Sequence, residues 1–109
     1  MTTPVFRYDT GKDGQPAAHA IGGVHAVFAK FLTEEASWTD YVDLLLDCVA
    51  TAAKTAKPQV NTGNAWAATV HDNSVTIEHL HIRGHTPEIV PLDVYVRALN
   101  EWRAFLLTA

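Results

Sequence analysis

Three histidines in the second half of the chain have a spacing that could hold a metal ion. His79, His81 and His85 form an H-x-H-x3-H pattern, and residues 79 and 81 point to the same face if the segment is a strand. Three imidazoles are enough ligands for a catalytic zinc ion. Neither H-E-x-x-H nor C-x-x-C accompanies them, and the neighbouring carboxylate, Glu78, points to the opposite face. We therefore interpret the histidines as exposed residues at a strand edge, and we expect no metal and no cofactor.

A run of acidic residues around position 40 could bind a cationic partner. Asp40, Asp43 and Asp47 have the i, i+3, i+7 spacing of one helix face, and like charges so placed repel one another by about 0.2–0.5 kcal/mol per pair. One interpretation is a solvated face that the helix dipole favours. The other is an anionic surface that attracts a basic protein. In the second case, the predicted partner-binding residues are Glu34, Glu35, Trp38, Asp40, Asp43 and Asp47.

The remaining residues that could perform chemistry are better explained by structure. No G-x-S-x-G motif is present, and the glycines match neither a P-loop nor a dinucleotide-binding fingerprint. Ser37 has the S-x-x-acid spacing of a helix cap, and Ser74 belongs to a turn. Cys48 falls in an apolar run, so we predict a buried small side chain rather than a nucleophile. We expect no catalytic activity, and a small metal-dependent enzyme using the histidines is the weakest alternative.

The composition indicates one globular domain over residues 1–109. Apolar residues make up 48% of the chain and charged residues 18%, which is typical of a globular protein. The net charge of −4 disfavours nucleic acid as a partner. A single cysteine favours a reducing compartment, and no targeting segment or membrane span is visible. We therefore expect a cytoplasmic protein without a membrane or nucleic-acid partner, either a monomer or a weak dimer.

In the first half of the chain, the patterns predict one strand and two helices. Pro4–Asp9 has the character of a strand, and the turn residues 10–15 follow it. Apolar residues from Ile21 to Leu32 recur with helical spacing, which predicts a helix. We favour a start near Ala18 with fraying at Gly22 and Gly23, and the alternative is a start after these glycines. A second helix is expected from Ser37 to a point before Pro58. Its apolar face is predicted to consist of Tyr41, Leu44, Leu45, Cys48 and Ala52.

The second half predicts three strands and a final helix. After a loop at residues 59–64, two strands are expected around a tight turn at residues 71–74. A short strand at residues 88–92, with Pro91 at its end, precedes the helix. The apolar stripe of that helix is Tyr95, Ala98, Leu99, Trp102, Phe105 and Leu106, and the residues expected to face water are Arg97, Asn100, Glu101 and Arg103. The predicted class is α+β, in the order β-α-α-β-β-β-α, with an antiparallel meander packed on helices.

The last 45 residues or so resemble a known family. The segment GNAW-x3-V-x4-VTIE-x-L begins at Gly63, and a short proline-bounded strand and an A-L-x-x-W-R-x-F-L helix follow it. This pattern resembles the small cytoplasmic immunity proteins of bacterial polymorphic-toxin and contact-dependent growth inhibition systems. The chain departs from the resemblance after the VTIE strand, where His81, Arg83 and His85 replace the expected acidic loop.

The resemblance implies a protein without catalysis of its own. Such a protein would bind and inhibit a cognate toxin domain, often a nuclease with a basic active-site cleft. The principal alternative is a protein-binding module without a toxin, such as an accessory subunit or a secretion chaperone.

Overall fold

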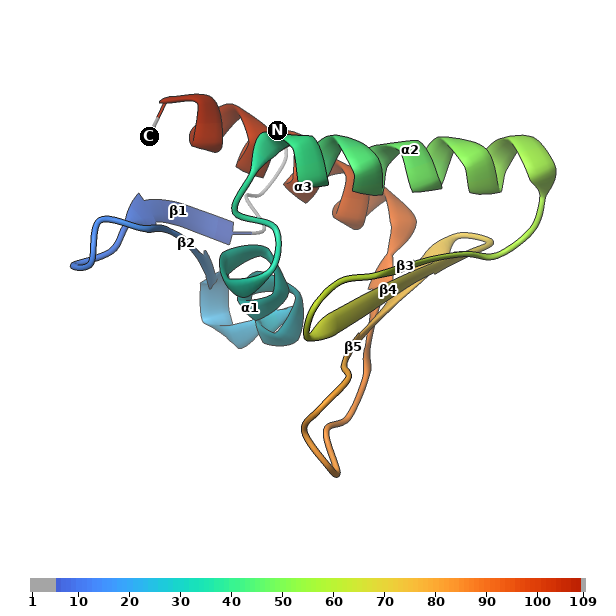
Figure 1. Cartoon of the computed structure of the whole chain (residues 1–109), viewed down its shortest axis with the longest axis horizontal. Coiled ribbons are helices and arrows are strands. Elements are labelled where there is room, and N and C mark those ends of the chain that lie inside the picture. The colour runs from blue at the N-terminus through green and yellow to red at the C-terminus, as the bar shows by residue number, and fades with distance from the viewer. Residues whose placement is uncertain (1–5, 109) are drawn as a thin grey trace.

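A computed structural model describes residues 6–108 of the chain, and Figure 1 shows its helices and strands. The predicted strand residues Pro4 and Val5 lie outside the described residues. In chain order, the elements are β1 (Phe6–Thr10), β2 (Pro16–Ala20), the 3-10 helix η1 (Ile21–Gly23), α1 (Ala26–Glu34), α2 (Thr39–Thr55), β3 (Gln59–Thr62), β4 (Trp66–His71), β5 (Ser74–His79), β6 (Glu88–Pro91) and α3 (Leu92–Thr108).

The larger sheet is an antiparallel meander in the order β3-β4-β5-β6. Its central hairpin pairs His71 with Ser74, and the turn between them uses Asp72 with φ 55°. This left-handed conformation is one that aspartate tolerates in a tight hairpin. In Figure 1, α2 and α3 lie over one face of this sheet, and α1 lies beside the end of the sheet, where it contacts β5 and β6; none of the helices in residues 6–108 covers the other face. The α+β class and the antiparallel meander packed on helices are confirmed.

The prediction that a helix begins near Ala18 was wrong. Residues 16–20 instead form β2, which pairs with β1 and places Ala18 opposite Tyr8. Gly22 and Gly23 have φ values of 66° and 76°, a left-handed conformation that no α-helix can contain. The helical spacing of the apolar residues is therefore real only from Ala26 onward, and β1 and β2 form a separate two-stranded sheet.

The N-terminus of α1 is capped by a side chain from the edge strand β6. Its N-cap residue, His25, is left-handed at φ 60° and makes no capping hydrogen bond with its side chain. Glu88 of β6 supplies the cap, because its Oε1 accepts a hydrogen bond from the Phe28 N–H at 3.2 Å. A carboxylate at a helix N-terminus also interacts favourably with the helix dipole.

The predicted loop at residues 59–64 was also wrong in part, because Gln59–Thr62 forms β3. The strand pairs with β4, with Val60 opposite Thr69 and Asn61 opposite Ala68. From α2, the Tyr41 hydroxyl donates a hydrogen bond to Asn61 Oδ1 at 2.8 Å. The meander therefore has one more strand than expected, and β3 forms one edge of the sheet.

The core contains aromatic side chains from elements that are far apart in the sequence. Trp66 and Trp102 are fully buried, as predicted. The indole Nε1 of Trp102 donates a hydrogen bond of 2.7 Å to the backbone oxygen of Ala36, in the link between α1 and α2. Phe28 packs against Tyr95 with ring centroids 5.2 Å apart. These contacts hold α3 against α1 and fix where α2 begins.

The polar side of α3 is less exposed than predicted. Glu101 Oε1 accepts a hydrogen bond of 2.8 Å from the Tyr8 hydroxyl of β1, and Arg97 pairs with Glu101 at 3.2 Å. Burial and this hydrogen bond to Glu101 raise the pKa of Tyr8. These residues dock the small sheet onto α3. Of the predicted water-facing residues, Asn100 is exposed, whereas Arg97, Glu101 and Arg103 are half-buried.

Candidate protein-binding surface

The predicted partner-binding residues lie at the start of α2 and the end of α1. The N-cap residue of α2 is Trp38, with an extended backbone and no side-chain capping hydrogen bond, so the predicted cap at Ser37 was wrong. The Trp38 side chain is 61% exposed. An exposed tryptophan is unusual on a free surface, and tryptophans often contribute much of the energy at protein interfaces.

The three aspartates of α2 have different surroundings. Asp43 is held by Arg103 of α3, with Oδ1 2.6 Å from Nε and Oδ2 3.4 Å from Nη2. The hydrogen bond and the charge of Asp43 raise the pKa of Arg103. Asp40 and Asp47 are exposed, and within the described residues neither has a hydrogen bond or an ion pair. Asp43 therefore joins α2 to α3, whereas Asp40 and Asp47 are available to a partner.

Leu44 is a member of this surface that the sequence interpretation missed. It was predicted to be in the core, but it is 48% exposed. Its position is i+4 from Asp40 and i−3 from Asp47, so all three side chains share one side of the helix. The same spacing that grouped the aspartates could have identified Leu44. We call Trp38, Asp40, Leu44 and Asp47 the α2 surface.

The two glutamates that precede α2 are engaged within the fold. Glu35 is half-buried and accepts a hydrogen bond from the Ala65 N–H at 3.2 Å. Burial, together with the charge of Glu35, raises the pKa of Tyr41 to about 12. Glu34 is exposed, but its Oε1 lies 3.4 Å from the indole Nε1 of Trp66. Glu35 therefore supports the turn between β3 and β4, and Glu34 lies at the border of the α2 surface.

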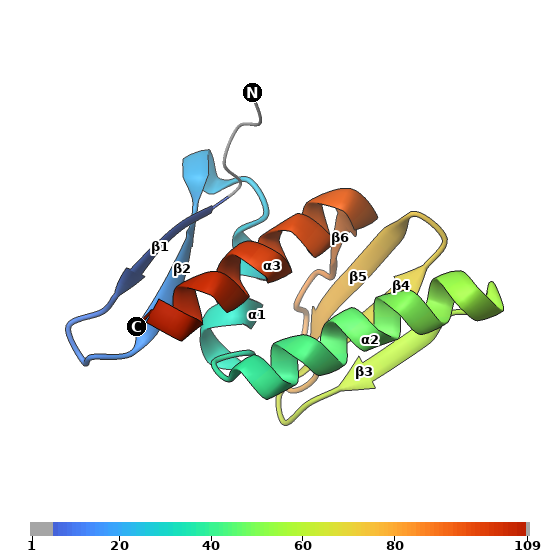
Figure 2. The same ribbon diagram turned by 90° about the horizontal axis from the view of Figure 1, so that it is seen from above.

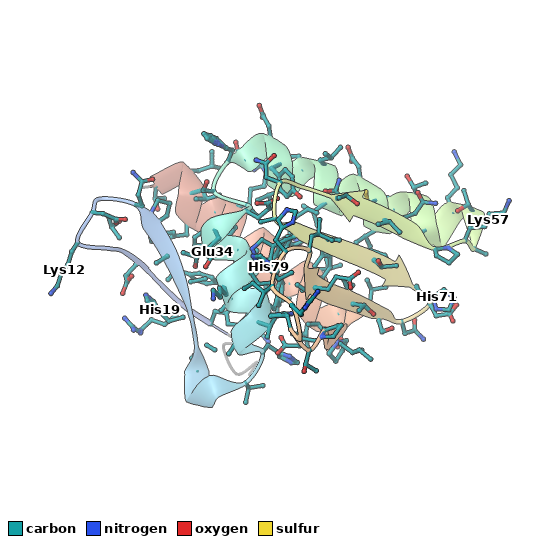
Figure 3. The ribbon with its side chains drawn as sticks, turned by 60° about the horizontal axis from the view of Figure 1, so that its bottom comes forward. Lys12, His19, Glu34, Lys57, His71 and His79 are labelled. Carbon is teal, nitrogen blue, oxygen red and sulfur yellow. The ribbon has the colours of Figure 1, made fainter. Side chains whose placement is uncertain are left out.

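The prediction that the three histidines are exposed at a strand edge was wrong for His79 and His85, which are half-buried against Trp66, whereas His81 is exposed. The strand ends at His79, whose ring centroid is 4.8 Å from that of Trp66, and His85 is 5.7 Å from it. Figure 3 labels Glu34 on α1 and His79 on β5. Both side chains contact Trp66, Glu34 through its carboxylate and His79 through its ring. Among residues 6–108, no group of three histidine, cysteine, aspartate or glutamate side chains is arranged to hold a metal ion.

The hydrogen bonds of His79 assign it a structural role. Its Nδ1 accepts bonds from the backbone N–H groups of His81 and Ile82, both at 3.1 Å. An Nδ1 that accepts two such bonds carries no proton, so the proton of the neutral ring is on Nε2. His81 reaches back to the Asn64 carbonyl oxygen at 2.9 Å. The loop after β5 is therefore held by imidazole side chains.

A cavity of about 530 Å³ lies at the opposite end of α2. Its apolar wall comes from Val49, Ala52 and Val70, and its polar residues include His71 and Asp72. His71 Nδ1 and Asp72 Oδ2 are 3.6 Å apart, and both side chains are exposed. This cavity is separate from the α2 surface and from the histidine cluster.

Comparison of the chain with protein-family models, with curated proteins and with solved structures finds no match. In residues 6–108, none of the helices has the length and apolar character that a membrane span requires. The described residues form an α+β protein in which Trp38, at the N-cap of α2, and the acidic residues Asp40 and Asp47 of α2 are exposed.

Proposed function

We propose that this protein binds and neutralises a basic toxin domain in the bacterial cytoplasm, as an immunity protein without catalytic activity. The observation that supports the proposal is the α2 surface, where Trp38 and Leu44 are exposed beside the carboxylates of Asp40 and Asp47. The resemblance of the last 45 residues or so to immunity proteins supplies the identity of the partner.

The charge of the chain and its exposed apolar side chains would contribute to toxin binding in different ways. A chain with net charge −4 attracts a cationic cleft, and the attraction raises the association rate at low salt. Carboxylates alone provide little affinity when they stay solvated. Trp38 and Leu44 supply apolar area that a partner can bury, and a central tryptophan can contribute about 2 kcal/mol or more to binding.

The test measures the affinity of the chain for the toxin domain encoded beside it. Trp38→Ala and Asp47→Lys are each expected to weaken binding by about tenfold or more, and Asp47→Lys should also lower the dependence of the association rate on salt. Protection of cells that express the toxin provides a second measurement.

The matched control is Asp93→Lys, which makes the same change in net charge at an exposed site in the first turn of α3. It is expected to bind like wild type. If Trp38→Ala and Asp47→Lys also bind and protect like wild type, the α2 surface is not the binding site. If the toxin domain does not bind the wild-type chain at all, the immunity function is refuted.

A further inference from the structure

The loop between β5 and β6 is held in place by imidazole groups. This segment, the 80–87 loop, projects from the end of the sheet away from α2 and α3 (Figure 1). Figure 2 shows α1 beside the end of β5 from which the loop starts, where α1 and β5 are in contact. Two backbone N–H groups of the loop, those of His81 and Ile82, donate to the Nδ1 atom of His79. The position of the loop therefore depends on the state of one ring nitrogen.

The observed position of the loop is compatible only with a neutral His79. A protonated imidazole carries a hydrogen on both ring nitrogens and has no acceptor left. Its Nδ1–H would point at the N–H groups of His81 and Ile82, which are donors as well. Both hydrogen bonds, each 3.1 Å long, would be lost. Proton uptake by His79 and the closed position of the loop therefore exclude each other.

The surroundings of His85 oppose a proton in the same way. Within residues 6–108, its Nδ1 atom is buried and has no hydrogen-bond partner. A protonated ring would place an N–H group at this position without an acceptor, which is unfavourable. The rings of His79 and His85 are 6.0 Å apart, so protonation of both would also add repulsion. His85 therefore favours the closed loop only when it is neutral.

The third histidine of this region, His81, differs from the other two. Its Nε2 lies 2.9 Å from the carbonyl oxygen of Asn64, and a carbonyl oxygen can only accept. This nitrogen therefore already donates its hydrogen, and protonation of the ring leaves the bond intact. A charge on His81 would still repel one on His79, because the two ring centroids are 6.1 Å apart.

The charged groups of the neighbouring elements do not hold a proton on His79. From α1, Glu34 is paired with Lys30 at 3.9 Å. Glu78, the residue before His79 in β5, points to the opposite face of the sheet. Arg83, in the loop itself, would repel a positive charge. Within residues 6–108, the histidines that pair with a carboxylate are His19, His25 and His71. The loop is therefore the part of the fold in which acid acts against the hydrogen bonds of the histidines.

We propose that the 80–87 loop is closed while His79 is neutral and opens when His79 takes up a proton. Histidine side chains change their charge between about pH 8 and pH 5, so the loop is closed at neutral pH and opens as the pH falls toward 5. Opening withdraws His85 from the indole of Trp66, which contacts Glu34 at the border of the α2 surface. The opening requires no partner, so its failure would leave the proposed immunity function untouched.

The first experiment follows the wild-type chain by NMR between about pH 7.5 and pH 5. Protection of the His81 and Ile82 amides, corrected for the intrinsic exchange rate, should fall by at least about tenfold, because uptake of one proton changes an equilibrium by up to about tenfold per pH unit. The nitrogen shifts of His79 should show protonation of Nδ1 over the same range, and the contacts between the ring protons of His85 and Trp66 should disappear. Equal protection at both ends of the range, or protection that persists once Nδ1 is protonated, would overturn the proposal.

The second experiment uses matched variants to separate His79 from the other histidines. His79→Asn supplies an oxygen acceptor that takes up no proton in this range, so the His81 and Ile82 amides should stay protected throughout. His71→Asn removes an exposed histidine at the other end of β4 and should lose protection as the wild type does. If His79→Asn still loses protection with falling pH, or if His71→Asn does not, another group is responsible and the proposal fails. If His79→Asn does not hold the loop closed at neutral pH, the His79 shifts of the wild-type chain decide the question.

Discussion

Replacement of Gly63 by alanine should destabilise the protein, because no space exists for a methyl group at this position. A Cβ atom on Gly63 would lie 2.7 Å from Glu35 Cδ and 2.9 Å from the Tyr41 hydroxyl oxygen. Both neighbours are held in place. Glu35 accepts the bond from the Ala65 N–H, and Tyr41 donates to Asn61. Neither side chain can move away without losing its hydrogen bond.

The expected cost follows from overpacking and from one lost hydrogen bond. Overfilling a well-packed site costs about 1–3 kcal/mol, and loss of the Glu35 or Tyr41 bond adds about 0.5–1.5 kcal/mol. Gly63→Ala should therefore lower the free energy of unfolding by about 2–4 kcal/mol. For a domain of this size, the melting temperature should fall by about 8–16 °C. Circular dichroism and urea titration measure both quantities.

A double-mutant cycle identifies Glu35 as the cause. Glu35→Ala removes the carboxylate that obstructs the methyl group, so Gly63→Ala should cost much less in that background than in wild type. If Gly63→Ala melts like wild type, or if the two changes are additive, Glu35 does not support this turn. Its carboxylate would then be as free to bind a partner as those of Asp40 and Asp47.

Two further changes test the interior and the histidine loop. Trp102→Phe leaves the buried Ala36 carbonyl without its indole donor and should lower the free energy of unfolding by about 1–3 kcal/mol. Trp102→Ala should lower it by about 3–5 kcal/mol. If the Phe variant is as stable as wild type in a urea titration, the hydrogen bond contributes nothing to stability. His79→Asn places an oxygen near the position of Nδ1, so the backbone amides of His81 and Ile82 should stay protected from hydrogen exchange. In His79→Gln, these two amides should lose their protection. Equal protection in both variants would contradict the structural role of the ring.

The sequence alone predicted the type and position of a helix or strand correctly where a periodic pattern of apolar residues covered the whole element. The second and third helices were predicted close to their observed ends, because Pro58 stops the one and Pro91 precedes the other. The hairpin at residues 71–74 follows from turn residues between two alternating apolar runs. Burial of Trp66 and Trp102 follows from their place on a strand face and on a helix stripe.

The errors arose where local pattern and tertiary pairing disagree. Residues 16–20 lack strong strand character, and they become β2 because β1 offers them a partner and Gly22 prevents an earlier helix start. Likewise, Asn61 favours a turn in isolation, but pairing with β4 and the bond from Tyr41 hold it in a strand. These partners lie elsewhere in the chain, so no window of local sequence contains the information.

For the same reason, the sequence alone could not show which of the acidic residues are free to bind a partner. Sequence spacing groups Asp43 with Asp40 and Asp47, but it cannot show that Arg103, 60 residues later, already binds Asp43. Charge reversal at Asp43 would break a link between α2 and α3 and would therefore lower stability and binding together. Asp47 has no such link within the described residues, so its reversal changes the surface charge alone. The effect of Asp47→Lys on toxin affinity, at an unchanged melting temperature, is therefore the measurement that separates an acidic binding surface from a merely solvated one.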